Sequence, residues 1–210
     1  AESAFRSAME KMPDDWRYAR PLLNLFIERF DLDGASALIK HLPAFDPHGI
    51  QGPSRAQLLL LEGRADDALK EVTREPNTMG YQRRFMTGVA YLKKGIADSA
   101  RGLDADASFK LSSDEFEALK RLDGRQRDFE IYFRLANALQ KGASSVHMEA
   151  IRDLRGRPLG RQEHLQDRGL AFRAYGEGFL ARGRWRRAKR EFENAIKISK
   201  RDFRAQDGLC

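Results

Sequence analysis

The side chains that most often carry catalysis or bind metals are scattered along this chain. Its histidines share no motif; they are His41, His48, His147 and His164. There is no His-Glu-x-x-His pattern, and Cys210 is the only cysteine, so no zinc site is predicted. The carboxylates of Asp66-Asp67 and of Asp104 and Asp106 fall near expected helix ends, where capping and solvation explain them better than acid–base catalysis does.

Loops that bind phosphate or calcium are not found in the sequence either. It contains neither Gly-x4-Gly-Lys-Ser/Thr nor Gly-x-Gly-x-x-Gly. The run Asp31-Leu32-Asp33-Gly34 begins like a calcium loop but lacks the downstream ligands and the terminal glutamate, and the stretch ASALIKHL that follows has a helical pattern. We therefore predict a protein that is not an enzyme and that holds neither a metal nor a cofactor.

Positive charge is concentrated near the C-terminus. Between Arg182 and Arg204 there are ten basic and three acidic residues, a local excess equal to the net charge of +7 of the whole chain. This stretch is either a solvated helix face or the docking site of an anionic partner, such as an acidic protein surface, nucleic acid or phospholipid head groups. Trp185 and Phe192 occupy expected core positions, which disfavours their stacking on bases. A polyanion site would use Arg182, Arg186, Arg187 and Arg190.

The composition is that of an ordered, soluble protein, because hydrophobic residues make up 41% of the chain and charged residues 33%. No apolar run approaches the roughly 18 residues of a transmembrane helix. The first residues, AESAFRSAMEK, lack the apolar core of a signal peptide. We expect a cytoplasmic or periplasmic protein, and the single cysteine excludes an internal disulfide.

The elements that would position the basic residues are clearest in residues 169–202, which read as two amphipathic helices joined at Gly183. Gly176 and Ala188 are small at points where the two helices would approach closely. One such hairpin cannot bury its own apolar faces, so similar hairpins are expected upstream. The residues that share the inward faces of the two helices are Phe172, Tyr175, Phe179, Ala188, Phe192 and Ala195.

This spacing of aromatic, glycine, alanine and phenylalanine residues resembles the tetratricopeptide repeat, a helix–turn–helix unit of roughly 34 residues. Weaker matches lie upstream, where Pro13 and Pro47 are one repeat length apart and turns are expected at Gly63, Gly95 and Gly142. The resemblance implies an all-α fold. Antiparallel helix pairs would stack into a right-handed superhelix of about five repeats, of the irregular kind found in bacterial proteins.

We expect one continuous array with three parts. Tetratricopeptide-like repeats occupy 1–103 and 128–210, and an inserted helix or linker occupies 104–127. A capping box, Ser112-x-x-Glu115, predicts the start of the inserted helix ahead of an amphipathic segment. Because both ends of the chain lie in repeat-like sequence, we expect a fragment of a longer protein.

The resemblance also implies a function, because first helices of successive repeats line a concave groove in which partners lie. We predict a non-enzymatic scaffold that binds a segment of another protein there, with bacterial secretion, pilus or exopolysaccharide assemblies as its settings. The alternative is a module that binds nucleic acid or another polyanion through the basic C-terminal helix pair. Groove residues expected to face water or the partner are Arg17, Asn24, Glu28, Gln82, Lys93, Tyr132, Arg173 and Glu177.

Overall fold

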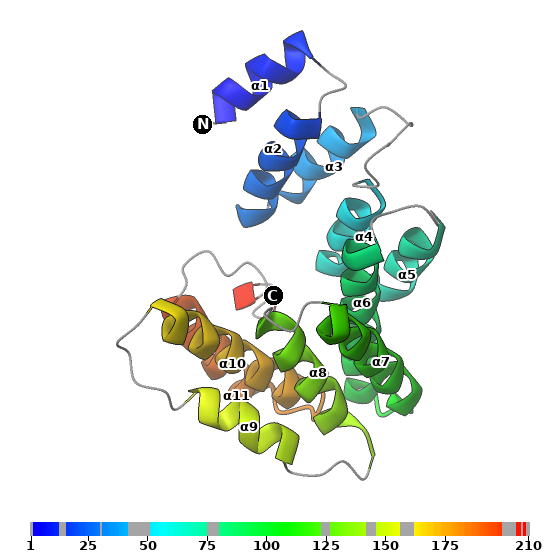
Figure 1. Ribbon diagram of the computed structural model, residues 1–210, viewed down its shortest axis with the longest axis vertical. Coiled ribbons are helices and arrows are strands. Elements are labelled where there is room, and N and C mark those ends of the chain that lie inside the picture. The colour runs from blue at the N-terminus through cyan, green and yellow to red at the C-terminus, as the bar shows by residue number, and fades with distance from the viewer. Residues whose placement is uncertain are drawn as a thin grey trace.

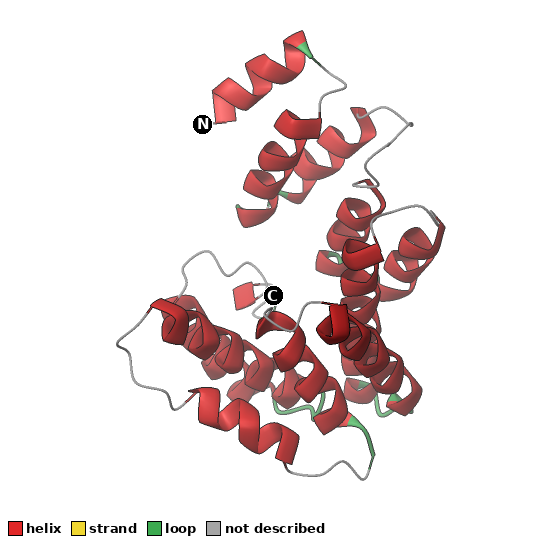
Figure 2. Ribbon diagram, in the orientation of Figure 1, coloured by secondary structure: helices red, strands yellow, loops and turns green. Residues whose placement is uncertain are grey.

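All the regular structure of the described residues is helical, so the predicted all-α class is confirmed (Figure 2). The computed structural model describes residues 2–12, 16–29, 31–41, 51–74, 80–122, 127–141, 146–155, 162–198, 205–206 and 208. The right-handed superhelix stays a prediction. None of the described helices combines the length and apolar character that crossing a membrane requires.

The helices follow one another along a bent path, from α1–α3 at one end through α4–α7 to α8–α11 (Figure 1). Each packs against its neighbours in sequence, so the apolar core extends along the path. Their bounds are α1 Glu2–Lys11, α2 Trp16–Glu28, α3 Leu32–His41, α4 Gln51–Leu61, α5 Ala65–Arg74, α6 Gly80–Ala100, α7 Asp106–Leu122, α8 Arg127–Leu139, α9 Val146–Arg155, α10 Gln162–Leu180 and α11 Trp185–Ile198.

In the described part of the chain, three helices end in the same glycine turn. Gly63, Gly102 and Gly183 have φ angles of 74°, 76° and 64°, in the left-handed region that a Cβ disfavours. In each turn the glycine N–H and the next N–H donate to carbonyls of the preceding helix, which is the Schellman pattern. The predicted turns at Gly63 and Gly183 are confirmed, whereas Gly142 lies outside the described residues.

The predicted turn at Gly95 is wrong, because α6 continues through it to Ala100 and the chain turns at Gly102. The glycine serves packing instead. A Cβ at Gly95 would lie 2.6 Å from Cε1 of Phe109, and one at Gly88 would lie 2.9 Å from Cζ of Phe116. The segment 104–127, expected to be an insertion, holds α7, and α7 packs along α6 with these two rings against the two glycines.

The predicted capping box at Ser112 is also wrong, since Ser112 and Ser113 are buried in the middle of α7. The Ser112 hydroxyl donates a hydrogen bond of 2.8 Å to the carbonyl of Gly88. A hydroxyl that bonds across to a neighbouring helix satisfies its own polar group while leaving the α7 backbone intact. Ser112 therefore joins two helices and does not start one.

The C-terminal pair α10–α11 has the predicted close approach. Phe192 is fully buried, and a Cβ on Gly176 would lie 2.5 Å from its Cε1 atom. Gly208 lies against the same ring, because a Cβ there would come within 2.5 Å of Cε2. Ala205 is buried in the same cluster. The ring is thus enclosed by glycine backbone from two segments.

Replacing Gly176 by leucine should separate α10 from α11, because the Phe192 ring fills the space that the new side chain needs. Overpacking of this kind costs about 1–3 kcal/mol. Chemical denaturation monitored by circular dichroism measures the loss.

Gly178→Ala is the matched control on the same helix. Its Cβ would meet Leu135 and Met148 at 3.7 and 3.8 Å, which is ordinary contact. Alanine also favours helix, so this variant should be at least as stable as the parent. Equal stability of the two variants would contradict the packing assigned to Gly176.

Candidate binding surfaces

The predicted groove residues do not form one exposed surface. Asn24 is exposed on α2, and Gln82 and Lys93 are half-buried on α6, three helical turns apart. The side chains of Arg17 and Glu28 lie outside the described residues. Tyr132, Arg173 and Glu177 are buried, with only 3%, 6% and 2% of their surfaces exposed.

The expectation that Tyr132, Arg173 and Glu177 face water is therefore wrong. The reason is that α8 and α10 pack directly on each other and cover the positions that an open groove would expose. The guanidinium carbon of Arg173 lies 5.6 Å from the centroid of the Tyr132 ring. This cation–π contact stabilises the pair of helices.

Tyr132 also belongs to an aromatic cluster that holds α6, α7 and α8 together. Its ring stacks on Phe116 with centroids 5.1 Å apart and an interplanar angle of 16°. Phe85 meets both rings edge-on at 6.0 and 6.1 Å. Offset and edge-on pairs of this kind contribute about 0.5–1.5 kcal/mol each beyond their burial. Tyr132 is thus a core residue and unavailable to a partner without unfolding.

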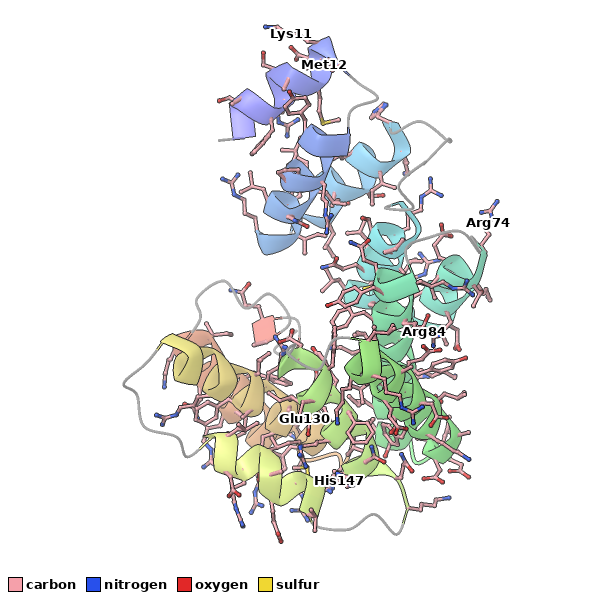
Figure 3. The ribbon with its side chains drawn as sticks, in the orientation of Figure 1. Lys11, Met12, Arg74, Arg84, Glu130 and His147 are labelled. Atoms are coloured by element: carbon pink, nitrogen blue, oxygen red, sulfur yellow. The ribbon has the colours of Figure 1, made fainter. Side chains whose placement is uncertain are left out.

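Glu130, labelled in Figure 3, marks the ionic contact between α7 and α8. It pairs with Lys120 of α7 and with Arg134 one turn along α8. Burial by itself would raise the pKa of Glu130, but the hydrogen bonds and charges of Lys120 and Arg134 outweigh burial and hold that pKa below its usual value. Lys120 Nζ also lies 4.1 Å from the centroid of the Phe133 ring. The cluster holds one carboxylate between two cations and joins two helices.

Exposed basic residues of the C-terminal pair are concentrated at the start of α11 and in the turn before it. Ala188, Glu191, Phe192 and Ala195 form the buried stripe of α11, and the outer face is left to charged residues. We define the α11 basic surface as the exposed side chains of Arg182, Arg184, Trp185, Arg186, Arg187, Lys189 and Arg190. Within the described residues, Arg190 alone of these has a carboxylate near it, that of buried Glu191 at 3.7 Å.

Trp185 was expected in the core, and this expectation is wrong, because 61% of its surface is exposed. Gly176 faces Phe192 in the antiparallel pair, so the position opposite Trp185 is the turn at Gly183, which has no side chain to cover an indole. The guanidinium carbon of Arg186 lies 5.1 Å from the indole ring. The position of Trp185, two residues after the turn glycine, was the sequence signal for this exposure.

The helices α5 and α11 begin after the same type of glycine turn, but their first turns carry opposite charges. Asp66 and Asp67 follow the turn glycine of α5 at the same offsets at which Arg186 and Arg187 follow the turn glycine of α11. Carboxylates interact favourably with the partial positive charge at a helix N-terminus, by about 0.3–1 kcal/mol each. Cations at the same place interact with it unfavourably. The arginines therefore weaken the helix that carries them.

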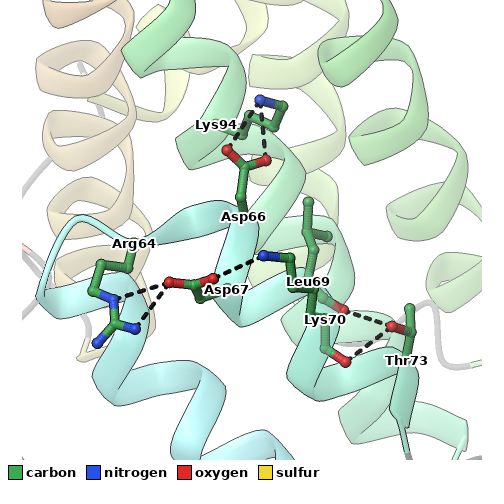
Figure 4. A network of polar contacts seen from close by, with 7 residues as sticks. All are labelled: Arg64, Asp66, Asp67, Leu69, Lys70, Thr73 and Lys94. Atoms are coloured by element: carbon green, nitrogen blue, oxygen red, sulfur yellow. Dashed lines mark hydrogen bonds and ion pairs between the residues drawn. The ribbon is translucent and has the colours of Figure 1, made fainter.

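The α5 carboxylates are fully engaged in ion pairs (Figure 4). Asp67 accepts hydrogen bonds from Lys70 at 3.1 Å and from Arg64 at 2.9 and 3.0 Å, and the hydrogen bond from Lys70, then that from Arg64, lowers the pKa of Asp67. Asp66 lies 3.1 Å from Lys94 Nζ of α6, and the hydrogen bond to Asp66, then that to Asp98, raises the pKa of Lys94. This helix start thus stabilises the fold.

No protein-family model matches the chain, and no curated protein or solved structure matches it either. The resemblance to tetratricopeptide repeats therefore stays a prediction. Among the described residues, no group of three or more histidine, cysteine, aspartate or glutamate side chains is placed to hold a metal ion.

Replacing Asp67 by asparagine should lower the melting temperature at pH 7 and matter less in acid. The folded-state pKa of Asp67 lies below its unfolded value, so its contribution to stability is complete above pH ~4 and is lost as the pH falls through the folded pKa. Thermal unfolding from pH 7 to pH ~2 should show the two curves converging.

Asp114→Asn on α7 is the control, because Asp114 is exposed and makes no ion pair within the described residues. It should leave the melting temperature unchanged at pH 7. A gap between Asp67→Asn and the parent that stays constant across this pH range would contradict the role given to the ion pairs.

Proposed function

We propose that this chain is a binding module built from paired helices, not an enzyme, and that an anionic macromolecule docks on the α11 basic surface. The observation that carries the proposal is the run of exposed cations from Arg182 to Arg190 on one helix and its turn, of which only Arg190 has a carboxylate near it among the described residues. Clustered charge of one sign attracts a partner of the other sign and speeds their encounter. The charges of α5, in contrast, are matched within the fold.

The cations on α11 also act against local stability, which supports a role in binding. Arg186 and Arg187 stand at the N-terminus of the helix, where a cation is unfavourable. In addition, Arg186 and Arg190 are four residues apart, a spacing at which like charges on a helix repel. Local conflicts of this kind are expected where a function requires them. An anionic partner would relieve both the repulsion and the unfavourable helix end.

Converting Arg186 and Arg187 to aspartate, which copies the α5 pair, should weaken binding without weakening the fold. The change removes the contact of Arg187 with the Phe179 ring, whose centroid lies 5.9 Å away, and gains two carboxylates at the helix N-terminus, so we expect the melting temperature to stay close to that of the parent. Affinity for poly-L-glutamate and for a fluorescein-labelled single-stranded oligodeoxythymidylate should fall at least tenfold in fluorescence or light-scattering titrations. The parent's affinity should also fall steeply with salt.

The matched control is Lys40→Asp/Lys110→Asp, which makes the same change in net charge at exposed sites on α3 and α7. It should retain the parent's affinity, because α11 packs against α10, away from both sites. The proposal fails if the two double variants lose affinity equally, or if the parent binds neither polyanion.

A second candidate function is the binding of a protein segment along the first helices. The observation in its favour is that alternate helices pack directly on each other, α4 on α6 and α8 on α10, as first helices do in a stack of helical hairpins. Such a site would use Asn24, Gln82 and Lys93, since Arg173 and Glu177 are buried. A partner retained at high salt by the parent, and lost with Gln82→Glu/Lys93→Glu, would support it.

A further inference from the structure

We propose that the partner of the α11 basic surface is a single-stranded nucleic acid and that Trp185 is a platform on which one base stacks. This inference rests on the proposed function and specifies its ligand. It starts from the one large aromatic side chain of that surface, which is exposed and has six exposed cationic residues within five positions of it along the chain. Exposed tryptophan beside arginine is the combination that binds unpaired bases together with their phosphates.

The indole is presented in a suitable way. Arg186 lies 5.1 Å from the ring and covers at most one of its two faces, and 61% of the residue is exposed. Trp185 is the first residue of α11, so its backbone is fixed by the helix and by the Schellman turn before it. Stacking of a base here would cost little conformational entropy of the Trp185 side chain, because that side chain has only two rotatable bonds.

The cations lie on both sides of the indole along the chain. Arg182 and Arg184 precede it in the turn, and Lys189 and Arg190 follow within about one and a half helical turns, roughly 6–8 Å along the axis. A strand whose base stacks on Trp185 therefore has cations for the phosphates on either side of that base. Contacts to phosphate account for most of the salt-dependent affinity of such complexes.

Other anionic partners use less of this surface. In duplex DNA the bases are stacked on one another, so the indole has no exposed base face to meet. An anionic membrane would require an apolar helix face to insert, and the apolar stripe of α11 is already buried against α10. An acidic peptide would engage the cations but gives the indole no stacking partner.

The experiment compares a ~10-nucleotide oligodeoxythymidylate with an abasic strand of the same number of phosphates and with poly-L-glutamate. Fluorescence anisotropy gives the affinities of the parent, Trp185→Ala and Trp185→Phe. In a Trp16→Phe background Trp185 is the only tryptophan of the chain, so its emission reports stacking directly. Because Trp185 is exposed, Trp185→Ala and Trp185→Phe should keep the melting temperature of the chain in which they are made.

We expect Trp185→Ala to weaken binding of the oligonucleotide by roughly five- to 150-fold, the loss of one stacked base. Trp185→Phe should lose far less, and affinity for the abasic strand and for polyglutamate should change less than about twofold. The oligonucleotide should quench the emission of Trp185, and the abasic strand should not.

The inference is overturned if Trp185→Ala leaves the oligonucleotide affinity unchanged or weakens all three probes equally. Tighter binding of duplex DNA or of phosphatidylserine vesicles than of the single strand overturns it as well. These outcomes leave the proposed function standing, provided that Arg186→Asp/Arg187→Asp still lowers the affinity for polyanions at least tenfold. A parent chain that binds no polyanion overturns both.

Discussion

The approach of a phenylalanine ring to a glycine backbone is the constraint on which the helix pairs depend. Phe109 and Phe116 of α7 lie against Gly95 and Gly88 of α6, and Phe192 lies against Gly176 in the C-terminal pair. A ring that enters the notch left by a missing side chain is buried completely without separating the helices. Two such contacts seven residues apart on each helix also fix the antiparallel register of α6 and α7. The hydrogen bond from Ser112 to the Gly88 carbonyl follows from that register.

The same packing contact determines which side chains of α11 are exposed. With Phe192 held at Gly176, the buried stripe is set by packing, and residues on the opposite side need not contribute to the core. The register also leaves Trp185 beside the turn, beyond the cover of α10. Its exposure is therefore a geometric consequence of a contact two helical turns away, and it places an indole among the cations of Arg184 and Arg186.

The sequence predicted the helical class and the C-terminal hairpin because packing glycine and turn glycine both stand at repeat spacing there. The prediction of a turn in α6 was wrong because the same glycine spacing occurs at two places with different structures. Gly88 and Gly95 are seven residues apart, as Gly176 and Gly183 are, yet Gly95 packs and Gly183 turns. Only the position of Phe109 on the following helix distinguishes the two cases. The burial of Tyr132 and Arg173 could not be predicted from the sequence pattern either. It arises from the contact between α8 and α10, which are distant in sequence.

The contrast between α5 and α11 separates charges that serve the fold from charges that serve a partner. Both helices begin after the same turn, so their different charges do not arise from backbone geometry. In α5 the carboxylates suit the helix end and each meets a cation of the chain. In α11 the cations oppose the helix end and repel one another, while burial of Phe192 and its neighbours keeps the helix in place. These cations oppose the helix end, and in the described part of the chain only Arg190 has a carboxylate near it, which is the physical basis for assigning α11 to an anionic partner.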